Sequence, residues 1–390
     1  MKNTIYLDYA ATTPIDPEVW TQMEKVAFHH FGNPSSLHLY GEQAEELMEE
    51  AKSKLSYLIG ARPGKVILTS GGTESNNLAL KGVAHHYATQ GNHIVVSAIE
   101  HDAILATCRT LEKEGLQITY LPVNQYGQVD LDALSAAITD QTLLVSIMHA
   151  NNETGTIQPV KQIGQIIRHK RTEQGTQTPF FHCDAVQTAG QLELKVEEWA
   201  VDLLSLSAHK FYGPKGVGAL YVRRGIRLVP LLDGGGQEYG WRSGTQNVPG
   251  LIGMVKALEL ARERLTADRE HYVTLNKKMR SALKELPGVR LTVPAEYALP
   301  SHLHFSCEQI EGQAIMQELS RQGIAVSTSS ACHAHHWQPS HVLKAMGYDD
   351  EQAKQAIRVS LGRLVKTDDI DQFLERLAGI ITTFRSSKVL

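Results

Sequence analysis

The pattern of hydrophobic and polar positions over the first two thirds of the chain predicts strands that alternate with helices. Apolar residues recur at helical spacing over residues 41–59, and Gly60 ends that pattern. Short apolar runs, separated by helix-length segments, then cover residues 65–70, 93–99, 117–123, 143–150, 180–185 and 203–208. Continuous apolar strands separated by helices are typical of a parallel sheet that helices cover on both faces.

The pattern changes near residue 250. A long helical run over residues 251–286 precedes predicted strands at 289–293, 302–306 and 324–327, and amphipathic segments at 341–346 and 368–385. This mixture predicts a smaller α+β domain. We therefore expect an α/β protein with a large domain over 16–255, a small C-terminal domain over 256–390, and an N-terminal segment, 1–15, that packs on the small domain.

The composition fits a folded enzyme of two or three domains. The chain has 390 residues, of which 42% are hydrophobic and 21% charged, which argues against disorder and against a membrane protein. The net charge of -4 and the scattered Lys and Arg residues argue against direct binding of nucleic acid or lipid. The first residues lack a basic segment followed by an apolar stretch, so we expect a cytoplasmic protein.

Polar clusters follow several of the predicted strands, where ligands of parallel sheets bind. The sequence GGTESNN, residues 71–77, follows the run 65–70 and begins a predicted helix. Glycines allow close approach of a ligand, and a helix N-terminus suits a phosphate. The simpler alternative is a capped turn in which Thr73 or Ser75 satisfies the helix end.

Two further strand ends carry a lysine and an acid. Lys210 follows the run 203–208, where a desolvated amine could form a Schiff base with a carbonyl cofactor, although a solvated lysine is the more ordinary alternative. Asp184 lies near the end of the run 180–185. It could keep the nitrogen of a pyridine ring protonated, or it could cap a helix.

An imidazole and a group of amides occupy the remaining strand ends. His101 follows the run 93–99 and could stack on a cofactor ring and exchange protons near neutral pH, which most single histidines do not do. Residues 151–155, NNETG, offer amides to a ring hydroxyl or a carboxylate, or form a polar turn. A Gly-rich turn, an imidazole, an acid and a lysine at four strand ends form a combination that chance seldom produces.

With these motifs in this order, the chain resembles the cysteine desulfurase family, in the branch of the nitrogen-fixation and iron–sulfur-cluster desulfurases. The matching segments extend over nearly the full length: YLDYAATTP, FGNPSSLH, TSGGTESNN, EHDAIL, NNETGTIQP, HCDAVQTAG, SAHKFYGPKGVGALYVRR, RSGTQNVPG and IRVSLGR. The resemblance implies a pyridoxal 5'-phosphate enzyme of the aspartate-aminotransferase fold, PLP fold type I, that works as a homodimer.

The resemblance also implies a role for each matching residue. Lys210 would bind the cofactor as a Schiff base, Asp184 would pair with the pyridine nitrogen, and His101 would stack on the ring. The further implied roles are contact with the ring hydroxyl by Asn152 and Gln187, phosphate binding by Gly72, Thr73, Ser207 and His209, binding of the neighbouring subunit's phosphate by Thr245, and substrate binding by Arg358 and Asn152.

Cys332 would receive the sulfur as a persulfide. An unperturbed thiol is only a few per cent ionised at pH 7, so it needs a nearby base or cation. The chain departs from the family in two respects: Ser329 replaces a common glycine, so the segment could be stiffer and transfer slower, and His333, His335 and His336 follow the cysteine. These histidines could bind a soft metal ion, stabilise the thiolate or lie in solvent.

The other cysteines are predicted to be core residues: Cys108 on a helix, Cys183 and Cys307 on strands. Four widely separated cysteines suit neither a disulfide framework nor a paired zinc motif, and no resident metal is expected.

The resemblance implies conversion of L-cysteine to L-alanine, with Lys210 removing the α-proton and His101 available for proton transfer. The persulfide would pass to an iron–sulfur scaffold, a tRNA-thiolation enzyme or a cofactor-synthesis enzyme, among which the sequence does not choose. One alternative is a related lyase or aminotransferase, including a selenocysteine lyase. Another is a non-catalytic carrier of sulfur or metal.

Overall fold

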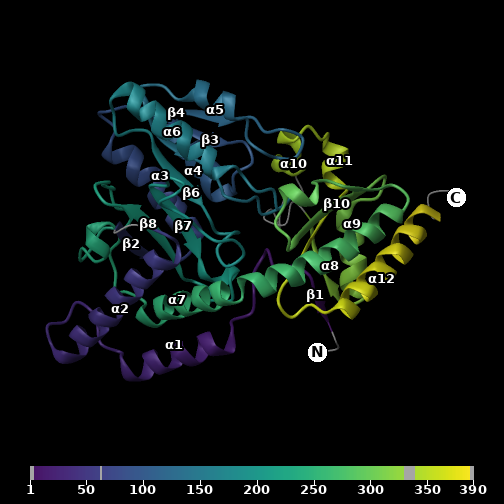
Figure 1. Ribbon diagram of the computed structural model, residues 1–390, viewed down its shortest axis with the longest axis horizontal. Coiled ribbons are helices and arrows are strands. Elements are labelled where there is room, and N and C mark those ends of the chain that lie inside the picture. The colour runs from purple at the N-terminus through teal and green to yellow at the C-terminus, as the bar shows by residue number, and fades with distance from the viewer. Residues whose placement is uncertain (1–3, 62–63, 329–338, 387–390) are drawn as a thin grey trace.

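A seven-stranded sheet forms the centre of the larger part of the molecule (Figure 1). The structure is a computed structural model that describes residues 4–61, 64–328 and 339–386. The strands lie in the order β2 (Gly64–Thr69), β8 (Gly218–Arg223), β7 (Leu203–Ser207), β6 (Phe180–Asp184), β5 (Thr142–Ser146), β3 (His93–Ser97) and β4 (Gln117–Leu121).

The sheet is mainly parallel, as the apolar runs predict, and each of the six predicted runs overlaps one of its strands. The exception is β8, which is antiparallel to both of its neighbours, β2 and β7. This strand was not predicted from the sequence. It returns the chain after a turn in which Gly216 has a φ of 75°, and it occupies the place between the first strand of the sheet and the strand before Lys210.

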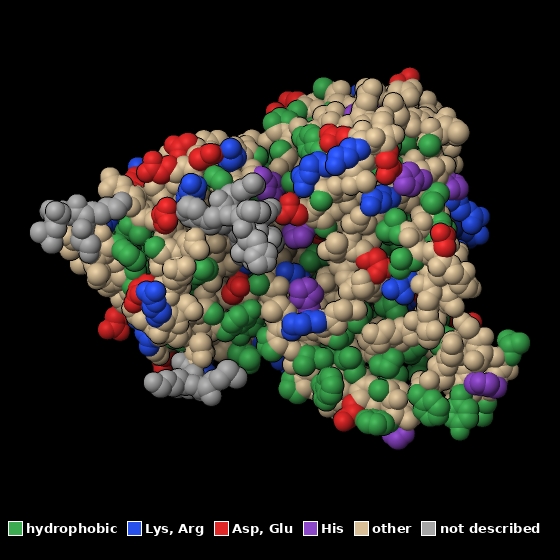
Figure 2. All heavy atoms as spheres, turned by 180° about the vertical axis from the view of Figure 1, so that it is seen from behind, with side chains coloured by type: hydrophobic (Ala, Val, Ile, Leu, Met, Phe, Trp, Pro, Cys, Tyr) green, Lys and Arg blue, Asp and Glu red, His purple; other side chains and the backbone are tan. Residues whose placement is uncertain are grey.

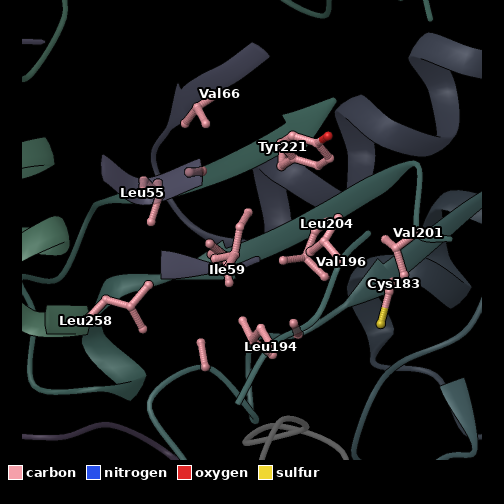
Figure 3. Packing of buried hydrophobic residues seen from close by; sticks show 14 of the residues in the cluster. Leu55, Ile59, Val66, Cys183, Leu194, Val196, Val201, Leu204, Tyr221 and Leu258 are labelled. Carbon is pink, nitrogen blue, oxygen red and sulfur yellow. The ribbon is translucent and has the colours of Figure 1, made fainter. Parts of the chain in front are cut away.

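Helices cover both faces of the sheet because buried side chains alternate along its strands. Val66 and Leu68 of β2 belong to the cluster that packs against α2 (Leu39–Leu58), α6 (Val160–Gln174) and α7 (Val248–Glu263). Ile67, between them, belongs to the cluster with α3 (Gly72–His86) and α4 (Asp102–Lys113). Figure 3 shows Leu55, Ile59 and Leu258 of the first cluster, together with Leu204 and Tyr221 of the same cluster. Helix α1 (Pro17–His29) lies on α7, and α5 (Leu131–Ala137) contacts α6.

A second, antiparallel sheet has its own hydrophobic cluster. Its strand order is β12 (Ser327–Thr328), β13 (Ala356–Ser360), β10 (His302–Cys307) and β9 (Val289–Leu291). The helices of this part are α8 (Leu265–Glu285), α9 (Gly312–Arg321), α10 (His341–Ala345), α11 (Asp350–Lys354) and α12 (Thr367–Ser386), with a 3₁₀ turn, η3, at Ala295–Tyr297.

The N-terminal segment reaches this second part. Strand β1 (Ile5–Tyr6) pairs in parallel with β11 (Ile324–Ala325), and the amide of Ser360 donates to the carbonyl of Leu7 at 2.8 Å. Residues 5–8 therefore lie beside the C-terminal sheet, and the chain crosses from there to the larger sheet.

The long helical run predicted over 251–286 is two helices rather than one. Helix α7 ends at Glu263 and α8 begins at Leu265, and Arg264 between them has φ -90° and ψ -1°. Helix α7 packs on α1 and α2, whereas α8 contacts β9 and α12 (Figure 1). The predicted domain limit at 255/256 falls inside α7, and the division into domains stays a prediction. None of the described helices has the length and apolarity that a membrane span requires.

Candidate active site

A cavity of about 350 Å³ lies where the carboxyl ends of β2, β5, β6 and β7 meet. Its walls include the N-terminal segment, the start of α3, the loops that follow the strands, and one residue of β13. The lining residues are Ala10, Ala11, Gly72, Thr73, Asn76, His101, Met148, Ala150, Asn152, Asp184, Val186, Gln187, Ser207, His209, Lys210 and Arg358.

Lys210 enters the cavity from η1 (Ala208–Lys210), the short 3₁₀ turn that follows β7. Its Nζ donates to the backbone carbonyls of Ala10 at 2.5 Å and Ala11 at 2.9 Å. The N-terminal segment is fixed against the same turn because the amide of Thr13 donates to the carbonyl of His209. Residues far apart in sequence thus hold the amine at the edge of the cavity.

Asp184 is the last residue of β6 and only 6% exposed. Its Oδ2 accepts a hydrogen bond from Nδ2 of Asn76 at 2.7 Å, and its Oδ1 accepts from the amide of Val186 at 2.9 Å. Two donors on one carboxylate fix its orientation. The carboxylate therefore accepts from the turn after β6 and also lines the cavity. No helix begins at this turn, all of which the structure describes, so the helix-cap alternative is wrong, and pairing with a ring nitrogen stays a prediction.

Helix α3 presents its N-terminus to the cavity without a side-chain cap. The N-cap is Gly71, at φ 154°, and the hydroxyl of Ser75 donates to the carbonyl of Gly71 instead of capping an amide. The capped-turn alternative is therefore wrong. A Cβ on Gly72 would lie 2.8 Å from Cγ2 of Val186, so only glycine fits there without displacement. Uncapped amides and the positive end of the helix suit an anion.

The two histidines of the cavity differ in their surroundings. His101 is the N-cap of α4, and its Nδ1 accepts from the amide of Ala103 at 3.1 Å, so in the neutral ring the proton is on Nε2. Burial, with the charges of Lys210 and Lys215, lowers the pKa of His209 to about 4. His209 is therefore neutral at pH 7, with its Nδ1 3.0 Å from Oγ1 of Thr12.

Arg358 brings the smaller sheet to the cavity. It lies on β13 and is 5% exposed, and its Nη2 donates to Asp8 at 2.8 Å while its Nη1 donates to the carbonyl of Asn152 at 2.9 Å. The buried Nε has no hydrogen-bond partner among the residues that the structure describes. A buried guanidinium with a donor to spare suits a carboxylate ligand.

Most of the residues singled out from the sequence thus lie around one cavity, and their individual roles stay predictions. Thr245 lies elsewhere, on an exposed loop before α7. Cys332, Ser329, His333, His335 and His336 lie outside the described residues. The predicted positions of the other cysteines are confirmed: Cys108 of α4, Cys183 of β6 and Cys307 of β10 are all buried.

Three polar residues near the site were missed. Asn76 follows the glycine-rich turn, and its sequence context is that of an ordinary helix residue. Its hydrogen-bond partner, Asp184, is 108 positions away, so the sequence does not reveal the contact. Glu100 and Glu153 each adjoin a predicted site residue, but no signal in the sequence shows that both are buried. Burial raises the pKa of Glu100 to about 8 and that of Glu153 to about 7.

Comparison with known proteins agrees with this geometry. The model of the family described as Aminotransferase class-V matches residues 5–373. The chain is 46% identical to "Cysteine desulfurase IscS" of Dictyoglomus turgidum, over 99% of this chain and 96% of that protein. It is 43% identical to the protein of the same name from Haemophilus influenzae, over 99% and 95% of the two chains.

The chain belongs to the cysteine desulfurase family of class-V aminotransferases. The solved structure of a "NIFS-LIKE PROTEIN" superposes with a TM-score of 0.90 at 40% identity, over 97% of this chain and all of that one. A second, "SspA in complex with cysteine", superposes with a TM-score of 0.80 at 35% identity, over 92% and 99%. The predicted fold class, a class-V aminotransferase fold with a mainly parallel central sheet, is confirmed.

Proposed function

We propose that the protein is a pyridoxal-phosphate-dependent cysteine desulfurase that converts L-cysteine to L-alanine and receives the sulfur on Cys332. The observation that carries the proposal is the convergence of Lys210, Asp184 and His101 on one cavity. The names of the most similar relatives support the reaction type. The similarity to SspA, whose solved structure is a complex with cysteine, supports the substrate.

The residues around the cavity fit the cofactor. A lysine amine for the aldehyde, an acid fixed by two donors for the ring nitrogen, and an uncapped helix N-terminus for the phosphate are all present. When bound, pyridoxal phosphate would withdraw electron density from the α-carbon of the substrate. Gly72, Thr73, Ser207 and His209 would hold the phosphate, and Asn152 and Gln187 would contact the ring hydroxyl.

The chain's own groups would then act in order. Arg358 binds the carboxylate of L-cysteine, and the Lys210 amine takes the proton from the α-carbon. The Cys332 thiolate bonds to the substrate sulfur as the carbon–sulfur bond breaks, and the electron pair left on carbon is protonated, with His101 available to relay protons. One L-cysteine and one thiol give one L-alanine and one persulfide, so no external oxidant or reductant is needed.

The cysteines that the structure describes are poor nucleophiles. Burial raises the pKa of Cys108 and that of Cys307 to about 12, and raises the pKa of Cys183 well above its ordinary value. A thiol with such a pKa is not a thiolate at neutral pH. This supports Cys332, the fourth cysteine of the chain, as the sulfur acceptor.

We further propose that the protein is a homodimer. Large apolar side chains are exposed along α1, the segment after it and the start of α2: Trp20, Phe28, Phe31, Leu37, Leu39 and Tyr40. Hydrophobic side chains gather in the corresponding lower right region of Figure 2. Monomers rarely leave such a surface uncovered. The predicted reach of Thr245 to a neighbouring phosphate supports a second copy of this chain as the occupant.

We also propose the classes of protein that accept the sulfur and the compartment in which the protein acts. The persulfide would pass to an iron–sulfur scaffold, a tRNA-thiolation enzyme or a cofactor-synthesis enzyme in the cytoplasm. The net charge of -4 gives no support for direct nucleic-acid binding.

The test is product analysis with L-cysteine, cofactor and a reductant. We expect alanine without a keto-acid requirement, a persulfide located by mass at Cys332, and an absorbance band that Lys210→Ala abolishes. Cys332→Ala should abolish persulfide and slow sulfide release at least ~100-fold, whereas Cys108→Ala, the control, should retain both. Sulfide release at the normal rate from Cys332→Ala would instead support a lyase, and absence of the absorbance band would support a non-catalytic carrier.

A further inference from the structure

The loop that carries Thr245 has an unusual backbone. Glu238 and Tyr239 both have left-handed dihedrals, with φ of 48° and 63°, inside the 3₁₀ turn η2 (Glu238–Gly240). Two consecutive residues other than glycine in this region are strained, and such strain persists only where the surroundings hold it. The turn must therefore be held by contacts outside the loop.

A buried ion pair holds it. Nζ of Lys52, on α2, lies 3.0 Å from Oε1 of Glu238, and the side chains are 5% and 1% exposed. The other carboxylate oxygen, Oε2, accepts a hydrogen bond from the amide of Leu68 in β2 at 2.8 Å. Because β2 is an edge strand of its sheet, Glu238 satisfies an amide at the sheet edge. Burial by itself lowers the pKa of Lys52, but the charge and hydrogen bond of Glu238, together with Tyr239 and Glu49, outweigh burial and raise the net pKa, so the ammonium stays charged.

Hydrogen bonds within the loop connect the turn that contains Glu238 to the residues just before Thr245. Oε1 of Gln237, next to Glu238, accepts from the amide of Gly244 at 2.9 Å. The hydroxyl of Ser243 accepts from the amide of Gly236 at 3.3 Å. Residues 236–244 therefore close on themselves, and fixing Glu238 fixes the residue that precedes Thr245.

Further contacts attach the loop to the phosphate end of the cavity. Nε of Arg242 donates to Oε1 of Glu74, in the first turn of α3, at 2.9 Å. Nζ of Lys65 lies over the ring of Tyr239 at 4.3 Å and over that of Trp241 at 4.5 Å. The loop is thus held on α2, β2 and α3 of its own subunit, while Thr245 at its end is exposed.

We propose that Lys52 and Glu238 are positioning residues that hold the loop of residues 236–245 so that Thr245 reaches the cofactor phosphate in the partner subunit. This inference rests on the proposed function, because it requires both the cofactor and the dimer. Neither residue lines the cavity, so neither touches the cofactor of its own subunit. A defect at this pair should therefore appear in the partner's site and not in its own.

The variants must separate loop positioning from folding. Glu238→Gln alone leaves the buried Lys52 ammonium with only Glu49, a half-exposed carboxylate at 3.2 Å, as its counter-ion, and could unfold the chain. The double variant Lys52→Met with Glu238→Gln removes both charges and keeps an amide oxygen that can accept from Leu68. The matched control is Lys161→Met with Glu198→Gln, since that pair, at 2.6 Å, is about half exposed and distant from the loop in sequence.

The experiment uses mixed dimers of two differently tagged chains, one of which carries Lys210→Ala. Release of the cofactor bound at the remaining Lys210 is followed by its absorbance. With the Lys52/Glu238 double variant on the Lys210→Ala chain, its loop serves the intact site, and we expect release to accelerate about tenfold, the effect of one weakened charge-assisted hydrogen bond. With the double variant on the chain that keeps Lys210, release should stay within about twofold of the Lys161/Glu198 control.

Unchanged release in the first arrangement would overturn the inference, and so would equal acceleration in both arrangements, since that indicates a general loss of structure. The unmodified protein distinguishes failure of the ion pair from failure of the proposed function. If it binds cofactor at Lys210 and forms a dimer, a negative result counts against the ion pair alone. If it lacks the Lys210-dependent band or the dimer mass, the proposed function fails and the inference with it.

Discussion

At the scale of single residues, the site depends on how Asp184 is held. A carboxylate that keeps a ring nitrogen protonated has to lie beside that nitrogen in the correct orientation. Asn76 donates one of the two hydrogen bonds that the Asp184 carboxylate accepts. Because Asn76 is 1% exposed, water cannot take the place of its amide without rearrangement. The acid could be found from its place at a strand end, but its amide partner could not, because that contact depends on how α3 packs over the sheet.

We predict that Asn76→Ala lowers kcat about 10- to 100-fold with little change in KM for L-cysteine. The reason is that a hydrogen bond to a charged group contributes about 1.5–3 kcal/mol, and its loss lets the carboxylate turn away from the ring nitrogen. Steady-state alanine formation checks the rate. A pH titration of the cofactor absorbance should show the ring nitrogen losing its proton at lower pH than in the unmodified protein.

Asn77→Ala is the control for this prediction. Asn77 is the next residue of α3, and its Nδ2 donates to the carbonyl of Thr73 within the same helix, at an exposed position. Its replacement should leave kcat within about twofold of the original, because exposed polar contacts contribute little. Equal losses in the two variants would show that α3 itself had been perturbed, and the special role of Asn76 would be withdrawn.

At the scale of elements, the local pattern of apolar residues predicted whether a segment is a helix or a strand better than it predicted how these elements are arranged. Each buried strand before Lys210 could be located because its side chains are apolar on both faces. Strand β8 was missed, and its insertion between β2 and β7 depends on pairing over long separations that a short run does not encode. The break at Arg264 was missed as well, because both halves of 251–286 have helical spacing and only their packing partners differ.

Helix α10 shows a tertiary contact serving as a helix cap. The hydroxyl of Ser340 accepts from the amide of Leu343 at 3.2 Å and donates to Oε2 of Glu153 at 2.5 Å. The next residue, His341, contacts the carbonyl of Glu100 through its Nε2. The start of α10 is therefore bound to the two loops that carry His101 and Asn152.

We predict that Ser340→Ala lowers the free energy of unfolding by about 2 kcal/mol. Loss of the cap costs about 1 kcal/mol, and a buried carboxyl without its donor adds about as much. Urea unfolding of the cofactor-free protein provides the measurement. Ser340→Thr, which keeps the hydroxyl, should lose less than about half of this amount, and a loss as large as that of the alanine variant would rule out the hydrogen bonds as the cause.

At the scale of the whole molecule, buried titratable groups connect stability to pH. Burial lowers the pKa of several histidines in the described part of the chain to between about 3 and about 4: His149, His182, His209, His302 and His304. For His209 and His302, nearby lysine or arginine charges add to the effect of burial. Burial acts in the opposite direction on Glu100 and Glu153, whose pKa values rise to about 8 and about 7.

The buried histidines and the buried carboxyls change the free energy of unfolding in opposite directions as the pH rises. A histidine with a lowered pKa stabilises the fold above its unfolded value of about 6.5, and this contribution is lost as the pH falls from there toward 4. A carboxyl with a raised pKa stabilises the fold below its unfolded value of about 4.5, and that contribution is lost as the pH rises toward 7 or 8. Near pH 6 the histidines outnumber the carboxyls, so the unfolded chain binds more protons than the folded one.

We therefore predict that the free energy of unfolding of the cofactor-free protein is highest near pH ~7 and falls by at least ~1 kcal/mol per pH unit below pH ~6. Urea unfolding between pH 5 and 8.5 measures it. Above pH ~7 the free energy of unfolding should fall less steeply with pH than it does below pH ~6. Glu153→Gln should make this alkaline decline smaller, because glutamine keeps an acceptor for Ser340 but has no titrating proton. Stability that is constant from pH 5 to 7 would show that these histidines are not buried in their neutral form.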